Sequence, residues 1–563
     1  MLKFGLKEVL ILLHLALGYP AASERLGSLG LSPGFGIYAA LFGILAAALF
    51  LTAHIRNGPL RWLCALILAA SAFFLDSFER VTADHMSYDV FITMLSSTGS
   101  EADALFQHRR AILLSLLSGS LLLLGIGLKP RPMPRQVRLA SFFAAPAAVL
   151  LLAAILFARG GEGARGLPGA FPPLSYSALL AYEAGTGEVG PRQPVRLRPA
   201  APLAGRDIVL IIDESIAGNY LDLNTKGGAR SGLAEPRPGV RIHRYGYAAS
   251  ITNCSVGVNV TLRYGGTRSD YRRINAVMPS VWAYAKQAGM RTAYLDAQLT
   301  GGRLHSLMDA AERREIDDFT QFDAVPVRDR DMAVADKLAE LLGNDRSDFI
   351  LVNKVGAHFP IHDKYPDAFM RHRPVLPRGG WLNVAETGSR AGFGGSAEDW
   401  VRYRNAYRNT LEWNVGAFFD RLLARADLSR ATIVYTSDHG QDLHERGNAG
   451  SNTHCGTEPA AEEGLVTLVA IEGEHLNTLP WEQNLAANRN RVSHYQIFPT
   501  LLALMGYEQA AVQPIYGDTL VVKSRDDFTF NTRFNARLGK EPVWKKIDLN
   551  SIVQPPAADS EKP

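Results

Sequence analysis

The sequence is poor in cysteine and carries little net charge of either sign. Its 563 residues include only three cysteines, Cys64, Cys254 and Cys455, and so few, so far apart, exclude a disulfide-rich scaffold. The formal net charge is +4, and lysine and arginine form no single long block. The composition therefore does not indicate a nucleic-acid-binding surface. A hydrophobic content of 47% is enough for a large core and for more than one structural part.

The N-terminus lacks a convincing cleavage site for a signal peptidase. Lys3 and Lys7 precede an apolar stretch at 9–17, as they would in a signal peptide, but no clear small-residue pattern follows. Further apolar segments come after it. We therefore expect an uncleaved first membrane helix.

Apolar segments recur through the first 160 residues. They occupy 9–22, 35–53, 62–75, 111–128 and 139–157. Because a helix needs about 20 apolar residues to cross a bilayer, the first and third segments are short, and each could instead be a buried helix of a soluble protein. Five such segments in series favour a bundle of five transmembrane helices at 1–158.

The basic residues predict the orientation of this bundle. They lie before the first span, between the second and third, and between the fourth and fifth: Lys3, Lys7, Arg56, Arg61, Lys129, Arg131, Arg135 and Arg138. Short loops rich in lysine and arginine stay in the cytoplasm. An odd number of spans then places everything after residue 158 outside it. The loop at 76–110 would also lie outside, although Arg109 and Arg110 at its end run against the rule.

The second half of the sequence predicts an α/β domain. Residues 159–203 are rich in glycine, proline and arginine and are typical of a linker, here along the membrane surface. From 204 to 545, helical stretches alternate with short apolar runs at 208–212, 292–295, 349–352, 432–435 and 466–471. This alternation favours a largely parallel sheet flanked by helices, followed by a C-terminal tail at 546–563. Such sheets bind ligands beyond the carboxyl ends of their strands.

Polar residues follow three of these runs. Asp-Glu-Ser occupies 213–215, Gly-Ala-His-Phe-Pro occupies 356–360, and Ser-Asp-His-Gly occupies 437–440. An aspartate or serine after a strand is often only a helix cap, but three such motifs at the same edge of one sheet favour metal ligands. Carboxylate and imidazole together suit Zn²⁺, and Mn²⁺ less well.

A further segment completes a family pattern. Thr-Asn-Cys-Ser-Val-Gly-Val-Asn at 252–259 precedes Leu-Arg-Tyr-Gly at 262–265. Asp-Glu after a strand, a hydroxyl residue at a helix start, Gly-x-His-x-Pro and Ser-Asp-His-Gly, in this order, resemble the sulfatase-like branch of the alkaline-phosphatase superfamily. Within it, the chain is most similar to the phosphoethanolamine transferases that modify lipid A. Their five spans, linker and outward-facing catalytic domain resemble the organisation predicted above. The resemblance implies a bacterial inner-membrane protein with its catalytic domain in the periplasm.

The resemblance also implies a set of site residues. The metal ligands would be Glu214, Ser255, Asp438 and His439. Counting back from the glycine at 265 places the nucleophile at Ser255 rather than at Thr252 or Cys254.

Two histidines match the pair that flanks the transferred phosphate in this family, namely His358 and His454. They would steady the phosphate and protonate the leaving alcohol. His362 and His444 also lie near the motifs, where we expect solvated surface histidines. Cys254 and Cys455 adjoin the nucleophile and His454, and either a disulfide or two free thiols would fit them.

The function implied is metal-dependent transfer of phosphoethanolamine from phosphatidylethanolamine to an envelope glycolipid or glycan, such as lipid A or a core sugar. The metal would lower the pKa of the serine hydroxyl, and the head group would pass through a covalent phosphoserine. Residues 256–259 match neither the Cys-Gly-Thr-x-Thr-Ala run of these transferases nor the x-Pro-Ser-Arg of sulfatases. The alternatives are a phosphoglycerol transferase of the lipoteichoic-acid-synthase or glucan-modifying type, a sulfatase-like hydrolase, and a non-catalytic membrane protein with a relic domain.

Overall fold

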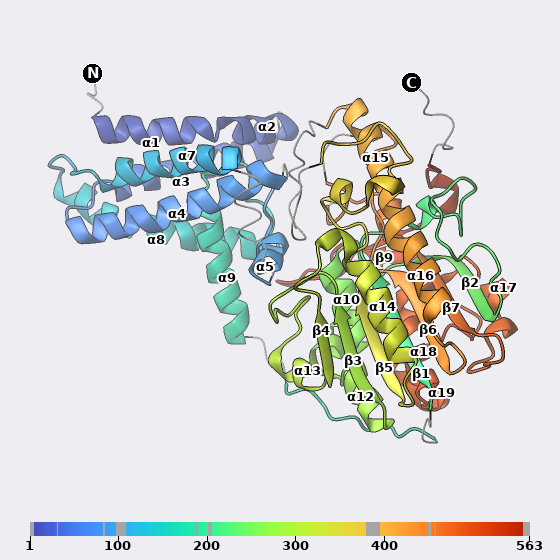
Figure 1. Cartoon of the computed structure of the whole chain (residues 1–563). Coiled ribbons are helices and arrows are strands. Elements are labelled where there is room, and N and C mark those ends of the chain that lie inside the picture. The colour runs from blue at the N-terminus through green and yellow to red at the C-terminus, as the bar shows by residue number, and fades with distance from the viewer. Residues whose placement is uncertain are drawn as a thin grey trace. The chain divides into compact units, whose positions relative to one another are not determined.

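The computed structural model of the chain describes residues 5–30, 32–82, 85–96, 109–186, 190–200, 205–378, 395–448, 452–456 and 458–555. It divides into two compact units (Figure 1). The helical unit comprises 1–98, 104–188 and 536–541, and the α/β unit comprises 99–103, 189–535 and 542–563.

Helices at the predicted apolar segments build the helical unit. Its helices are α1 (Leu6–Leu17), α2 (Tyr19–Leu29), α3 (Pro33–Thr52), α4 (Gly58–Thr82), α5 (Tyr88–Ser96), α7 (Arg109–Gly127), α8 (Arg135–Ala158) and α9 (Pro172–Thr186). Among the described residues, α3, α8 and the Gly58–Arg80 part of α4 are long and apolar enough to cross a membrane, and α1 with α2, bent by 54°, could form a fourth span. Ile112–Gly127 is a shorter apolar helix. Five spans therefore remain a prediction, but the third is longer than its apolar run suggested.

Hydrogen bonds from basic side chains connect the three segments that we predict to be cytoplasmic. The Lys7 ammonium donates hydrogen bonds to the carbonyls of Ala53 and, at 2.9 Å, Leu128. The Arg61 guanidinium donates to the carbonyl of Gly127 at 3.0 Å. The N-terminus, the α3–α4 connection and the α7–α8 connection thus lie together. Alternate connections of a bundle of spans would meet in this way, and the side of the membrane that they face stays a prediction.

The stretch expected as an irregular linker contains a helix, α9. The double proline at 172–173 predicts a loop, but proline is well tolerated in the first turn of a helix, where its missing N–H is not needed. Ser175 Oγ donates to the carbonyl of Val149 at 3.1 Å, and the Tyr176 hydroxyl donates to that of Met86 at 2.8 Å. Residues 172–186 therefore pack within the helical unit.

The α/β unit is built on one eight-stranded sheet of order β4-β3-β5-β1-β6-β7-β2-β8. Its strands are β1 (Asp207–Asp213), β2 (Val240–Ala249), β3 (Arg291–Asp296), β4 (Asp318–Gln321), β5 (Asp348–Asn353), β6 (Ala431–Ser437), β7 (Leu465–Gly473) and β8 (Val492–Ser493). All five predicted runs are strands, and β2, β4 and β8 were not predicted. Strands β1, β3, β4, β5 and β6 pair in parallel, whereas β7 is antiparallel to β6 and β2. The sheet is therefore largely parallel, as expected.

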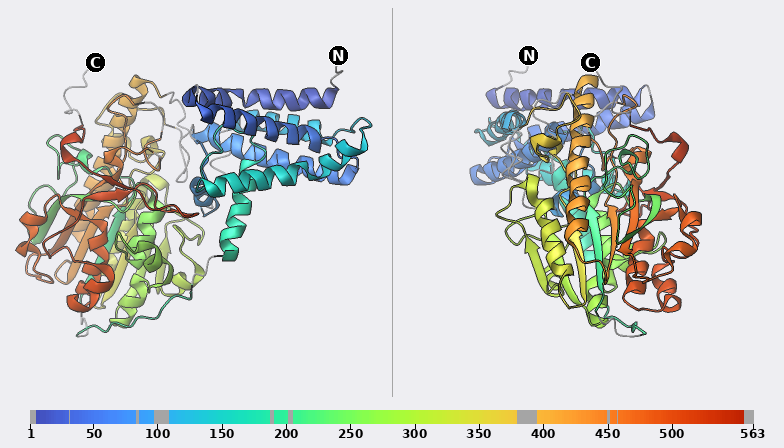
Figure 2. Two further views of the ribbon diagram at one scale, coloured as in Figure 1. Left: turned by 180° about the vertical axis from the view of Figure 1, so that it is seen from behind. Right: turned by 45° about the vertical axis from the view of Figure 1, so that its right-hand side comes forward.

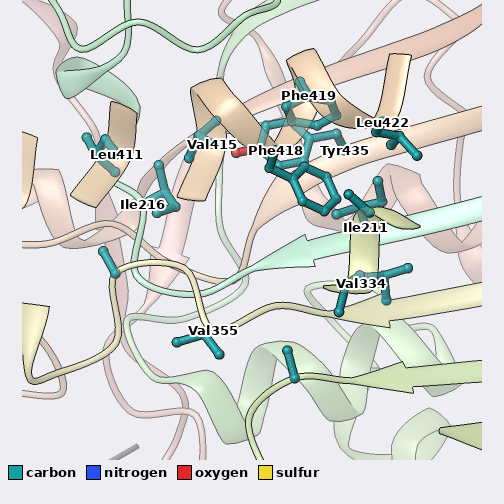
Figure 3. Close-up of a cluster of buried hydrophobic side chains, with 14 of the residues drawn as sticks. Ile211, Ile216, Val334, Val355, Leu411, Val415, Phe418, Phe419, Leu422 and Tyr435 are labelled. Carbon is teal, nitrogen blue, oxygen red and sulfur yellow. The ribbon is translucent and has the colours of Figure 1, made fainter. Parts of the chain in front are cut away.

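Helices cover both faces of this sheet. They are α10 (Ser255–Tyr264), α11 (Tyr271–Val277), α12 (Val281–Gln287), α13 (Ala310–Arg314), α14 (Arg330–Leu342), α15 (Ala397–Leu411), α16 (Phe418–Arg425), α17 (Leu485–Asn488), α18 (Ile497–Leu504) and α19 (Gln509–Tyr516). Ile211 of β1 packs with Val334 of α14 and Phe418 of α16 on one face (Figure 3). Leu210 of β1 points to the opposite face and belongs to a second buried cluster. The left view of Figure 2 shows the helices on that face from behind. Because both faces are buried, the central strands β1 and β5 carry continuous apolar runs.

The C-terminal segment packs on the α/β unit as far as it is described. After the small antiparallel pair of β9 (Thr529–Asn531) and β10 (Trp544–Lys546), the Asn219 amide donates to the carbonyl of Val553 at 2.8 Å. Thr225 Oγ1 donates to Gln554 Oε1 at 2.8 Å. The first half of the expected tail at 546–563 is thus anchored, and residues 556–563 lie outside the described part.

Candidate metal centre

The centre forms where the adjacent parallel strands β1 and β6 end. Asp213 is paired with Ser437 in the sheet register, so the next residues of both strands emerge side by side. Glu214, Asp438 and His439 are buried there, and one potential ligand atom from each lies within 4.8 Å of the others. The strand-end motifs of the sequence thus meet in space.

Hydrogen bonds fix the orientation of Asp438 and His439. Asp438 Oδ1 accepts from the backbone N–H of Ser215 at 2.8 Å and from that of His439 at 2.7 Å. Ser215 has a φ of 61°, a left-handed conformation that costs about 1–3 kcal/mol and is characteristic of functional sites. His439 Nδ1 lies 2.7 Å from the carbonyl of Gly440, which places its proton on Nδ1 and leaves the lone pair on Nε2.

The remaining oxygen of Asp438 fits a cation. Asp438 Oδ2 is buried and has no hydrogen-bond partner among the residues that the structure describes, and it lies 3.5 Å from His439 Nε2. Burial, followed by the charge of Asp438, raises the pKa of Glu214 well above its usual range. A buried acceptor without a donor and two carboxylates that repel each other are both stabilised by a divalent metal ion. The group of oxygen and imidazole-nitrogen atoms fits such an ion.

Ser255 joins this group from a different element. It is the first residue of α10, and its Oγ donates to Glu214 Oε1 at 3.2 Å and lies 3.2 Å from His439 Nε2. The neighbouring candidates point elsewhere. Thr252 Oγ1 donates to Asn253 Oδ1 at 3.4 Å, and Cys254 forms a disulfide with Cys455.

The two predicted flanking histidines lie near the centre in different ways. The ring of His454 stacks on that of His439, with centroids 4.5 Å apart and 28° between planes. His358 is half-buried, with Nδ1 2.9 Å from the carbonyl of Phe359. Burial, and then the charge of Lys364, lowers the pKa of His358 to about 3.

Glycine is required where the His358 loop passes the centre. Gly356 has a φ of 51°, and a Cβ atom at this position would lie 2.5 Å from the carbonyl oxygen and 2.7 Å from the amide nitrogen of Glu214. Any larger residue would push the Glu214 backbone away.

His362 and His444 are not the surface residues that the sequence suggested, since both are buried. His444 Nδ1 and Nε2 lie 3.0 Å from the carbonyl of Asn448 and 2.9 Å from that of Asn452, and its ring stacks on Trp400. This histidine holds a loop together. The sequence did not reveal that His444 is buried, because its position near a motif says nothing about burial.

Sequence reasoning missed two residues that support Glu214. The Gln298 amide donates to Glu214 Oε2 at 3.1 Å and to the carbonyl of Lys354 at 2.9 Å. The Lys354 ammonium, fully buried, lies 2.6 Å from Asp213 Oδ2 and donates to the carbonyl of Asn414 at 2.5 Å. Gln298 and Lys354 both follow the ends of predicted strands. The rule that ligands bind beyond the carboxyl ends of parallel strands could therefore also have found them.

Comparisons with known proteins identify the family. The sulfatase family model matches residues 206–507, more than half of the chain. The curated phosphoethanolamine transferase EptA of Escherichia coli, strains O157:H7 and K12, is 26% identical over 179 residues, which cover 30% of this chain and 30% of the relative.

Two solved structures resemble this chain to different degrees, and the first of them shares its fold. The integral membrane lipooligosaccharide phosphoethanolamine transferase A (EptA) from Neisseria meningitidis has a TM-score of 0.62 at 15% identity, covering 89% of this chain and 96% of that chain. The C-terminal periplasmic domain of EcEptC from E. coli has a TM-score of 0.48 at 16% identity, covering 64% and 97%. The predicted fold, apolar helices followed by a sulfatase-like α/β domain with a largely parallel sheet, is confirmed. By the match of its α/β domain, the chain belongs to the sulfatase family.

Proposed function

We propose that the protein transfers phosphoethanolamine from phosphatidylethanolamine to an envelope glycolipid or glycan through a covalent intermediate on Ser255. The observation that carries this proposal is the position of Ser255 Oγ, 3.2 Å from both a carboxylate and an imidazole of the candidate metal group. A hydroxyl beside a cation site can become a nucleophile at neutral pH. Apolar N-terminal helices suit a lipid donor, and the positive charges favour a catalytic domain in the periplasm at the bacterial inner membrane.

The metal would be held by Glu214, Asp438 and His439, with Ser255 as the fourth ligand. Zn²⁺ suits two carboxylates, an imidazole and a hydroxyl, and Mn²⁺ suits them less well. When bound, such an ion supplies a Lewis acid that lowers the pKa of the serine hydroxyl and offsets the charge of the phosphodiester.

The side chains divide the remaining work. Ser255 Oγ gives up its proton to solvent water and forms a bond to phosphorus, while the bond from phosphorus to the diacylglycerol oxygen breaks. That oxygen takes up a proton, for which we assign His454 as the donor because its ring stacks on that of His439. His358, neutral because burial lowers its pKa to about 3, can donate only a hydrogen bond to the phosphate. A hydroxyl or phosphate oxygen of the acceptor then attacks phosphorus and releases Ser255.

Trapping the intermediate tests this proposal. The purified full chain, loaded with Zn²⁺, is incubated with vesicles containing phosphatidylethanolamine or phosphatidylglycerol, and the peptide carrying Ser255 is sequenced by tandem mass spectrometry. We expect a phosphoethanolamine adduct on Ser255 and none in Ser255→Ala. The variant Ser269→Ala, at an exposed serine shortly after α10, should load as the wild type does.

Each alternative has its own outcome in this assay. A phosphoglycerol adduct formed only with phosphatidylglycerol would replace the ethanolamine assignment. An adduct on Thr252, or full transfer by Ser255→Ala, would refute the nucleophile. The acceptor is then sought by mass spectrometry of envelope glycolipids from cells with and without the protein.

A further inference from the structure

The disulfide joins the immediate neighbours of two site residues. Cys254, the N-cap of α10, directly precedes Ser255, and Cys455 directly follows His454. Their Cα atoms are 5.1 Å apart although 201 residues separate them in sequence. The bond therefore connects the backbone beside the proposed nucleophile to the backbone beside the proposed proton donor.

The nucleophile side of this link is firmly anchored. Asn253, only 3% exposed, donates from its amide to Glu463 Oε2 at 2.8 Å. Its carbonyl accepts the backbone N–H of Cys455 at 3.1 Å. A main-chain hydrogen bond thus runs beside the disulfide, and together they tie the segment carrying His454 to a buried asparagine.

The segment carrying His454 is held on both sides of the histidine. Before it, the carbonyl of Thr453 accepts the backbone N–H of Asp442 at 2.7 Å, and His444 Nε2 lies 2.9 Å from the carbonyl of Asn452. After it come the disulfide and the hydrogen bond of Cys455. Neither cysteine belongs to the metal group, so the link can act on His454 without altering the carboxylate ligands.

We infer that the Cys254–Cys455 disulfide is a positioning element of the catalytic centre: it holds His454 beside Ser255, and efficient transfer requires it to be intact. This inference rests on the proposed function. A misplacement of about 1 Å of a catalytic group can cost on the order of 10²-fold in rate. Loss of the bond should therefore lower kcat by roughly 10- to 100-fold, with metal content unchanged because Glu214, Asp438 and His439 are carried by the ends of β1 and β6.

The bond is open to chemical reduction. Cys254 is half-buried and Cys455 exposed. A dithiol reductant attacks one sulfur to give a mixed disulfide and then closes to its own cyclic disulfide. Two electrons and two protons pass to the protein, and the S–S bond is replaced by two thiols. Outside the cytoplasm the oxidised form is the stable one.

A double-mutant cycle tests the link. The full-length, zinc-loaded variants are Cys254→Ser/Cys455→Ser, His454→Ala and their combination, with Cys64→Ser as the control. If the disulfide acts through His454, its removal lowers kcat in the wild type and changes it by less than about twofold in His454→Ala. A dithiol should inactivate the wild type but not the serine variant, and reoxidation should restore it. Additive losses, or a serine variant as active as the wild type, would overturn the inference.

A second measurement does not depend on the substrate. The rate at which diethyl pyrocarbonate modifies His454 is followed by mass spectrometry of the holoenzyme. Stacked on His439, His454 should react several-fold more slowly in the wild type and in Cys64→Ser than in Cys254→Ser/Cys455→Ser. Equal rates would refute the positioning role even if transfer is observed. A rate difference in a protein that loads no head group from either lipid would instead refute the proposed function and leave the link intact.

Discussion

Removing the buried ammonium of Lys354 should destabilise the α/β unit and disturb the centre. Lys354 and Asp213 are both fully buried, 2.6 Å apart, and Asp213 directly precedes Glu214. Burial raises the pKa of Asp213 to about 6, against the opposing charge of Lys354. Lys354→Met keeps the length of the side chain but leaves a buried carboxylate without its cation, since Tyr435 at 3.1 Å supplies only a neutral donor.

The magnitude follows from the burial of the pair. Breaking a buried ion pair by removing one partner costs about 3–5 kcal/mol. A unit of roughly 350 residues has an unfolding entropy of about 0.7 kcal/mol/K, so Tm should fall by about 4–7 °C. Adding Asp213→Asn removes the orphaned charge, and the double variant should recover about 2 °C or more.

The assay is thermal unfolding of the full chain in detergent, with zinc content measured alongside. Lys337→Met is the matched control, because Lys337 pairs with Glu340 at the surface and such pairs contribute about 0–1 kcal/mol. The deficit of Lys354→Met should also shrink from pH 8 to pH 5. Because the pKa of Asp213 is raised in the folded state, this carboxylate takes up a proton there at a pH at which the unfolded state has not yet bound one. Protonation removes the unpaired charge and so reduces the loss of stability. A Tm within about 1 °C of the wild type, or no recovery in the double variant, would refute this reasoning.

Three further predictions follow from the described contacts. Gly356→Ala should lower both Tm and zinc content, measured by thermal unfolding and metal analysis, because its Cβ would lie 2.5 Å from the carbonyl oxygen of Glu214. Burial raises the pKa of Glu463 to about 8, so its protonated form stabilises the fold fully below about pH 4.5, and that stabilisation is lost as the pH rises through 8. Glu463→Gln should flatten the fall of Tm between pH 5 and 8, whereas exposed Glu474→Gln should not. A reporter that is active only in the cytoplasm, fused after Pro563, should be silent, and strong activity would contradict the five-span topology.

The fold could be predicted wherever burial leaves a continuous mark on the sequence. Strands β1, β3, β5, β6 and β7 each contain a short apolar run because both faces of the sheet are covered. Strand β2 escaped because Arg241, His243 and Arg244 interrupt it, and β4 and β8 are short edge strands. Helix α9 escaped because its two prolines are common in loops as well as in first helical turns.

Two kinds of information in the sequence predicted the site: the residues that follow strand ends, and the motifs shared with the resembled family. Both pointed to Glu214, Asp438, His439 and Ser255, and the structure brings these four together. The resemblance also pointed to His454, and its ring stacks on that of His439. The disulfide beside it could not be decided, because the sequence of Cys254 and Cys455 fits a bond and two free thiols equally well. The family prediction itself is confirmed by the match at 206–507.

The start of α10 suits the nucleophile proposed at Ser255, although the sequence around it differs from that of the transferases it resembles. The N-cap of α10 is Cys254, which makes no side-chain capping hydrogen bond because its sulfur is committed to Cys455. A serine, threonine or aspartate at the N-cap would have bound the first-turn amides itself. A cysteine leaves them for an anion carried by the next residue, where the helix dipole also favours negative charge. The phosphoryl group on Ser255 would then meet backbone amides on one side and the metal group on the other. In the proposed mechanism, the same disulfide would hold His454 and leave the backbone amides at the start of α10 to the intermediate.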